Sequence, residues 1–172
     1  MAEPTVNQTD TVSFGERLAA SQHFSDLFRE GMTLVEETAS YLDGPGRQES
    51  KKLERGASLA YATESMRLTT RLMQLASWLL LHRAVNEGEM SLAQASQEKS
   101  KVKLAVPELR DEETTRLLPS VLGDLIARSL KLLDRVRRLD ATIHAAATTR
   151  SAANPVERQL GLLKAAFERE AQ

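Results

Sequence analysis

The chain of 172 residues has no cysteine, only eight glycines and five prolines, and an aromatic content of 4%. Without cysteine there can be no disulfide, no thiolate metal ligand and no cysteine nucleophile, and a reducing compartment is allowed. With so few aromatic residues, a core must consist mainly of Leu, Ala, Val and Met. The net charge of −1 gives the whole molecule no strong attraction to nucleic acid or to anionic membranes. Few breakers and an aliphatic core favour a small number of long helices.

The N-terminal residues 1–12 are polar and show no periodicity, so they are predicted to be a disordered tail. They lack the basic and apolar regions of a signal peptide, which makes the cytoplasm the expected location. The length suits one domain, predicted as a helical bundle over residues 13–148.

The stretch from Leu53 to Glu87 predicts the central helix of this bundle. Two apolar stripes run along it, namely Leu59, Met66, Met73 and Leu80 at intervals of seven, and Leu68, Leu72, Leu75 and Leu79. The turn at 78–81 is apolar on almost every side, so it needs more cover than two neighbouring helices give. We therefore expect a homodimer with Trp78, Leu79 and Leu81 as candidate interface residues. Interruption by Arg83 argues against a membrane span.

Turn signals divide the chain into three main helices. Asp43-Gly44-Pro45-Gly46 predicts the end of the first helix and a tight reversal of the chain. Pro119 suits the first turn of the third helix, or alternatively a kink in a helix that begins near Asp111. Ser91 and Gln94 form a box-like start for a short extra helix between the second and third. The predicted fold is all-α, an antiparallel three-helix bundle with flexible termini and helices near 14–42, 50–87 and 118–147, plus a lesser helix at 92–101.

The third helix is predicted to have an apolar inner stripe and a basic outer stripe. The inner residues are Leu122, Ile126, Leu133, Val136, Leu139 and Ile143, and the outer ones are Arg128, Lys131, Arg135 and Arg138. The basic stripe, with a helix-turn-helix-like start at 91–96, supports an alternative function as a nucleic-acid-associated helical regulator. No glycine turn or recognition helix follows that start. Because Asp124 and Asp134 stand four residues before an Arg, a solvated face with local ion pairs is the preferred interpretation.

Two further segments are candidate partner-binding sites. Lys99, Lys101 and Lys103 form a small basic loop cluster, for which the plainer interpretation is solvation. Residues 149–172 are predicted to be a flexible tail with a short amphipathic helix, because the chain after His144 has the composition of a linker. The face of this helix, Leu160, Leu163, Lys164 and Phe167, is too small to bury itself, so we expect it to fold on a partner. Docking of the tail on its own bundle is the alternative.

No pattern in the sequence predicts an enzyme. The histidines His23, His82 and His144 have no helical metal-ligand spacing, so no metal site and no cofactor are expected. No phosphate-binding glycine loop and no nucleophile elbow occur. Glu64, Arg67 and Arg71 share one face of the central helix and could clamp a carboxylate, although an intrahelical ion pair is the commoner arrangement.

Two long runs resemble one known family. Residues 58–81 read SLAYATESMRLTTRLMQLASWLLL and are followed by RAVNEGEM at 83–90, and residues 28–47 read FREGMTLVEETASYLDGPGR. These runs strongly resemble the RcdA family of alphaproteobacterial regulators of CtrA degradation. The resemblance extends over about residues 14–138, although the loop at 96–110 and the tail from Ser151 match the family pattern least.

The resemblance implies a homodimeric three-helix bundle without catalytic activity. Members of the family act as adaptors for the ClpXP protease, together with the response-regulator-like protein CpdR, and some associate with PopA. The expected partners are therefore the ClpXP system, a CpdR-like regulator and substrates such as CtrA, with no membrane or nucleic acid. Recruitment to a cell pole would fit this role. A structural dimer without a delivery role is a third interpretation.

Overall fold

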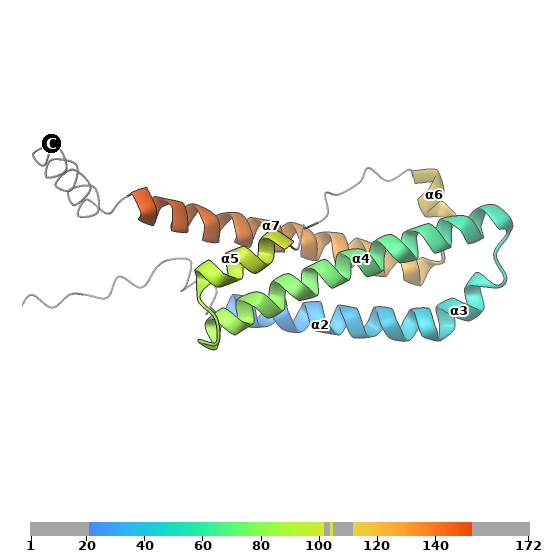
Figure 1. Cartoon of the computed structure of the whole chain (residues 1–172). Helices are drawn as coiled ribbons and strands as arrows, with labels where there is room; N and C mark the ends of the chain where they lie inside the picture. The colour runs from blue at the N-terminus through green and yellow to red at the C-terminus, as the bar shows by residue number, and fades with distance from the viewer. Residues whose placement is uncertain (1–20, 102–103, 105–111, 153–172) are drawn as a thin grey trace, which may run out of the picture.

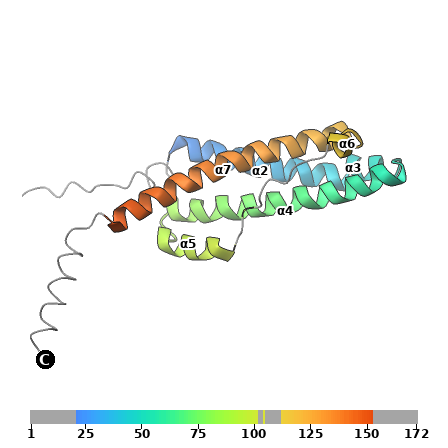
Figure 2. The same cartoon turned by 90° about the horizontal axis from the view of Figure 1, so that it is seen from above.

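The computed structural model describes residues 21–101, 104 and 112–152, and these residues form helices with no strand among them. The helices are α2 (Gln22–Asp43), α3 (Pro45–Ser50), α4 (Arg55–Asn86), α5 (Leu92–Lys101), α6 (Glu112–Arg116) and α7 (Ser120–Ala152). The helices α2, α4 and α7 pack against one another along their lengths, and α5 lies on α4 (Figures 1 and 2). The all-α three-helix bundle is therefore confirmed. The predicted start of the first helix near residue 14 and the predicted amphipathic helix of the tail lie outside the described residues.

The directions of the three long helices differ in part from the prediction. Helix α2 runs antiparallel to both α4 and α7, whereas α4 and α7 run parallel to each other (Figure 1). Two contacts show the parallel register, since Arg71 lies beside Ser129 and Trp78 lies beside Asp140. The prediction of three antiparallel helices is wrong for this pair. The cause is α5, which carries the chain back along α4 before α7 begins (Figure 2).

The chain reverses later than the Asp43–Gly46 signal predicts. Helix α2 does end at Asp43, but α3 begins at once with Pro45 in its first turn, and the reversal comes at residues 51–54. Proline suits a helix start because its fixed φ is helical and its missing amide proton is not needed there. The hydroxyl of Tyr41 in α2 donates a hydrogen bond to Glu49 in α3 at 2.7 Å. Burial and this contact raise the pKa of Tyr41.

The core follows the predicted helical periods closely. The inner stripe of α7 is buried over its whole length, and the buried positions of α2 follow steps of three and four. Helix α4 buries Leu68, Leu72, Leu75 and Leu79, so its second apolar stripe is the one that faces the core. Close packing of α2 on α4 depends on Gly31, where a Cβ atom would lie 2.5 Å from the Leu79 side chain. Aliphatic packing between three long helices thus forms one continuous core.

The short helices and the start of α7 agree with the predictions, whereas the end of α7 corrects one. Helix α5 has the predicted bounds, and Ser91 and Gln94 make the reciprocal capping-box hydrogen bonds at 2.9 and 3.2 Å. Pro119 separates α6 from α7 and does not kink a continuous helix. Helix α7 continues to Ala152, through the linker-like residues after His144 and into the tail that was predicted to be flexible from residue 149. Alanine is the best helix former, so an Ala-rich segment can extend a helix that is already nucleated.

Candidate functional site

The basic stripe of α7 is largely neutralised by acidic residues of α2. Arg128 pairs with Glu37 and Arg135 pairs with Glu30, while Arg138 pairs with Asp134 within α7. The hydrogen bond from Arg128 lowers the pKa of Glu37 below its ordinary value. These pairs are partly exposed and add little stability each. They do, however, cancel most of the positive charge that a nucleic-acid surface would need.

Lys99 does not project from a loop but joins α5 to α7. Its Nζ lies 2.5 Å from Asp140 Oδ2, and the other oxygen of Asp140 accepts a hydrogen bond of 2.9 Å from Trp78 Nε1. His144 completes this group, with Nδ1 2.9 Å from the backbone oxygen of Asp140 and with Lys99 Nζ 3.4 Å from its Nε2. Lys99 therefore links α5 to α7 within the chain. The side chain of Lys101 and all of Lys103 lie outside the described residues.

His82 is buried next to this group and is held in its neutral form. Its ring lies 4.0 Å from that of Trp78, centroid to centroid, and its Nδ1 has no hydrogen-bond partner among the described residues. Burial lowers the pKa of His82 to about 4. The nearby Asp140 carboxylate raises this pKa to a smaller extent, and the charge of Lys99 lowers it. Across residues 21–101, 104 and 112–152, no group of three or more acidic or histidine side chains could hold a metal ion.

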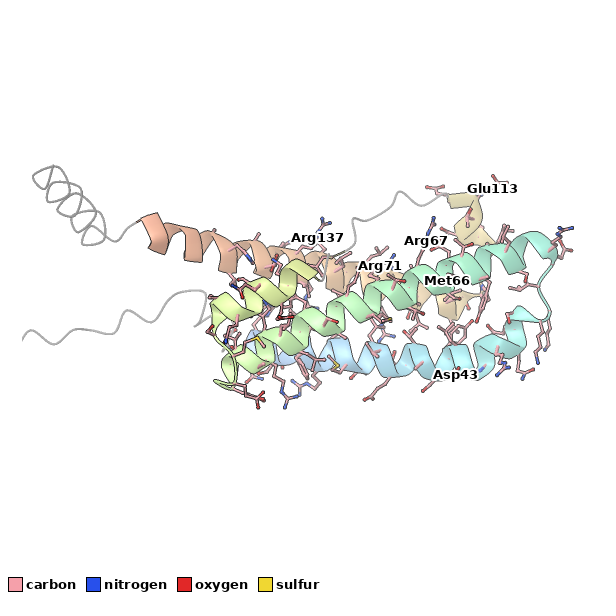
Figure 3. The ribbon with its side chains drawn as sticks, viewed as in Figure 1. Asp43, Met66, Arg67, Arg71, Glu113 and Arg137 are labelled. Carbon is pink, nitrogen blue, oxygen red and sulfur yellow. The ribbon has the colours of Figure 1, made fainter. Side chains whose placement is uncertain are left out.

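The possible carboxylate clamp on α4 is engaged within the fold. Arg67 Nη1 lies 2.8 Å from Glu64 Oε1, which confirms the intrahelical ion pair. Arg71 Nη1 donates a hydrogen bond of 2.8 Å to Ser129 Oγ in α7. Glu64, Arg71 and Ser129 are buried, and the hydrogen bond between Arg71 and Ser129 joins α4 to α7. Figure 3 shows Arg67 and Arg71 close to each other along α4.

The candidate dimer residues are mostly inside the core. Trp78 and Leu79 are both 0% exposed within one chain, and Leu81 is half-buried. Since α2, α5 and α7 already cover this turn of α4, Trp78 and Leu79 present no surface to a second subunit. The expectation that these two residues form an interface is therefore corrected, and for Leu81 it stays a prediction.

The exposed apolar surface lies instead on the seven-residue stripe of α4. Leu59, Met66, Met73 and Leu80 are 70%, 72%, 67% and 52% exposed. Beside this stripe an apolar groove of about 270 Å³ runs between α2 and α4, with Val35, Ala39 and Leu42 on one wall and Thr69, Met73 and Ala76 on the other. The periodicity of the stripe is visible in the sequence, but its exposure is not.

The fold and these surfaces define a helical-bundle protein. Its polar side chains mainly connect helices to one another, and its exposed apolar face lies on α4. None of its described helices is both long and apolar enough to cross a membrane. Comparison with known proteins then identifies the family. A family model described as a protein of unknown function (DUF1465) matches residues 15–167.

The chain also matches the crystal structure of RcdA from Caulobacter crescentus with 52% identity and a TM-score of 0.60. The match covers 74% of this chain and 96% of that one. No curated protein matches. The chain belongs to the RcdA family, as the runs at 28–47 and 58–90 predict.

Proposed function

We propose that this protein is a non-enzymatic adaptor in regulated proteolysis. It delivers cell-cycle regulators such as CtrA to the ClpXP protease, together with a CpdR-like response regulator, and a PopA-like protein is a further candidate partner. The observation that supports this proposal is the 52% identity to RcdA over 96% of that chain. We propose the cytoplasm as its location, and recruitment to a cell pole would fit this role.

Reconstituted proteolysis tests the proposal. Purified ClpXP and a CpdR-like protein are mixed with candidate substrates, with and without this protein, and substrate loss is followed over time. We expect faster loss of at least one cell-cycle regulator and no change for a substrate that ClpXP degrades unaided. Equal rates for all candidates, with CpdR present, would contradict the adaptor role.

The tail is the part that we propose contacts a partner, through Leu160, Leu163, Lys164 and Phe167. Burial of each large apolar side chain is worth roughly 1.5–3 kcal/mol. Ordering of the helix consumes much of that gain, so we expect weak, regulated binding. Because α7 reaches Ala152, the deletion that isolates the tail removes residues 153–172.

We expect this deletion to abolish delivery and to leave the melting temperature unchanged. The point variant Phe167→Asp should reproduce the loss, whereas Arg158→Ala, on the opposite side of the predicted helix, should not. A drop in melting temperature would favour docking of the tail on its own bundle. Delivery that survives the deletion would contradict a tail site and would favour the loop lysines Lys101 and Lys103.

The nucleic-acid alternative has less support than the adaptor role. Three of the four cations on the basic stripe pair with carboxylates at short range. Salt-sensitive binding of the purified protein to duplex DNA would revive this alternative, because release of counterions makes such binding fall steeply with salt.

A further inference from the structure

Helix α5 has little apolar contact with the rest of the bundle. Among its described side chains, Ala95 is buried, Leu92 and Lys99 are half-buried, and the others are exposed. Figure 2 shows α5 on the outside of the bundle, along the C-terminal half of α4. A helix of ten residues is marginal alone in water, so the position of α5 depends on its contacts with α4 and α7.

The polar contact that joins α5 to α7 lies near the C-terminal end of α5. Lys99 Nζ is 2.5 Å from Asp140 Oδ2 and 3.4 Å from His144 Nε2. The Lys99 and Asp140 side chains are 21% and 17% exposed, so water reaches both and the pair adds only a modest free energy. Asp140 also accepts the hydrogen bond from Trp78 Nε1 through its other oxygen. Lys99 can therefore move away while Asp140 still joins α7 to α4.

A glycine lies in the turn between α4 and α5. Gly88 has a φ of 76°, and it is the only residue with a positive φ in the part of the chain that the structure describes. A Cβ atom at Gly88 would meet no atom within 4 Å, so this position is not packed against the bundle. Glycine adopts positive and negative φ with similar ease. The turn at 87–91 can therefore act as a hinge.

His82 lies on the part of α4 that α5 covers. Because α5 returns along α4 from the turn at 87–91, Ala95 comes level with His82 and Lys99 comes level with Trp78. The contacts of Lys99 and Trp78 with the same carboxylate agree with this register. His82 is 3% exposed, and its Nδ1 has no hydrogen-bond partner among the described residues. A buried nitrogen without a partner favours any state in which water reaches it.

We propose that α5 is a strap that turns about Gly88 and opens while α2, α4 and α7 stay packed, so that water reaches His82. In the closed form Lys99 holds the far end of the strap on Asp140. In the open form the His82 side chain and the adjoining edge of the Trp78 ring are exposed. This inference rests on the contacts of α5 and does not depend on the adaptor role.

Protons should favour the open form of the strap. The charged or titratable groups that face His82 are Lys99 from α5 and Asp140 and His144 from α7. Burial holds the pKa of His82 at about 4 in the closed form, below its ordinary value of 6.5. The open form therefore takes up a proton first as the pH falls, and its share rises between pH 6.5 and 4. The two pKa values give a rise of about tenfold from pH 7.5 to pH 5.5.

Thiol labelling measures the opening directly, because the chain has no cysteine of its own. His82→Cys places a thiol under the strap, and Ser129→Cys places one between α4 and α7, where the side chain is 0% exposed. Under native conditions a thiol reagent should label the first variant at least about tenfold faster than the second, because the second requires opening of the bundle itself. Labelling of His82→Cys should also depend less steeply on urea, since opening of the strap exposes less surface than unfolding.

Substitutions in the His82→Cys background test the two ends of the strap. Lys99→Met removes the charge that pairs with Asp140 and should raise the labelling rate about fivefold. The control Lys131→Met, on the exposed side of α7, should leave the rate unchanged. Gly88→Ala should also raise the rate, because the closed turn needs a positive φ that an alanine disfavours.

Amide exchange followed by mass spectrometry tests the proton effect without a cysteine. After correction for the intrinsic exchange rate, the α5 amides of the wild type should exchange about tenfold faster at pH 5.5 than at pH 7.5. In His82→Gln the rise should be less than about twofold. His144 faces the same group, so His144→Gln is the matched control and should keep the rise.

Three results would overturn the proposal. Equal labelling of His82→Cys and Ser129→Cys, with the same dependence on urea, would show that α5 opens only when the bundle unfolds. Unchanged labelling after Lys99→Met would show that Lys99 does not hold the strap. Faster exchange at pH 5.5 that persists in His82→Gln would assign the proton uptake to another group. Substrate delivery is not measured in these experiments, so the adaptor role is tested separately.

Discussion

Removal of the Asp140 carboxylate should destabilise the bundle strongly, because three helices meet at this side chain. Oδ1 accepts the hydrogen bond from Trp78 Nε1 in α4, and Oδ2 pairs with Lys99 in α5. In Asp140→Ala the indole N–H loses its acceptor while the Trp78 side chain remains buried. A buried donor left without a partner costs about 1–3 kcal/mol. Loss of the partly exposed ion pair adds up to about 1 kcal/mol.

The expected loss of about 1–4 kcal/mol corresponds to a fall in melting temperature of roughly 2–16 °C for a chain of this size. Thermal denaturation followed by circular dichroism measures it. Asp140→Asn separates the two contacts, because the amide oxygen can still accept from Trp78 although the charge is gone. We expect Asn to retain more than half of the stability that Ala loses.

The matched control is Asp134→Ala, six residues earlier on α7. Asp134 pairs with Arg138, and both side chains are well exposed, so the change should cost less than about 0.5 kcal/mol. If Asp140→Ala is no more harmful than Asp134→Ala, the Trp78 hydrogen bond does not stabilise the fold. If Asn is as harmful as Ala, the ion pair with Lys99 is the dominant contact.

Two further changes test the packing and the pH dependence of the fold. Gly46→Ala should destabilise the fold by about 1–3 kcal/mol in a denaturant titration, because its Cβ would lie 2.7 Å from both the Tyr41 ring and the Tyr61 hydroxyl. The control is Gly56→Ala, whose Cβ would meet no atom within 4 Å. In the same titration this variant should be as stable as the wild type or more stable. The pKa of His82 is about 4 in the fold, below its ordinary 6.5, so the unfolded chain takes up a proton first and stability should fall as the pH drops from about 6.5 to 4. His82→Gln should flatten this slope in urea titrations at pH 7 and pH 5, and an unchanged slope would contradict the assignment to His82.

Local signals in the sequence predict the helices well and their directions poorly. The start of α5 follows from the Ser91 and Gln94 side chains, which accept hydrogen bonds from amides three residues away. The prediction of a chain reversal at Pro45 is wrong for a local reason too. A proline after the end of α2 is also a good first residue for a new helix, and here it begins α3. The parallel course of α4 and α7 depends on where α5 packs. Contacts 58 and 62 residues apart, such as Arg71 with Ser129 and Trp78 with Asp140, leave no local pattern to detect.

For the candidate site too, periodicity shows which residues share one face of a helix, but it does not show whether that face is buried. The seven-residue spacing of Leu59, Met66, Met73 and Leu80 is plain in the sequence, but a stripe that packs inside the chain and one that packs against another molecule have the same spacing. Only the packing of α2, α5 and α7 decides, because they cover Trp78 and Leu79 and leave Met66 and Met73 exposed. The charged residues were also ambiguous, since Lys99 and Arg128 each meet a carboxylate from a distant segment. Once these charges are paired, the seven-residue stripe of α4 is an apolar surface that the described part of the chain leaves exposed.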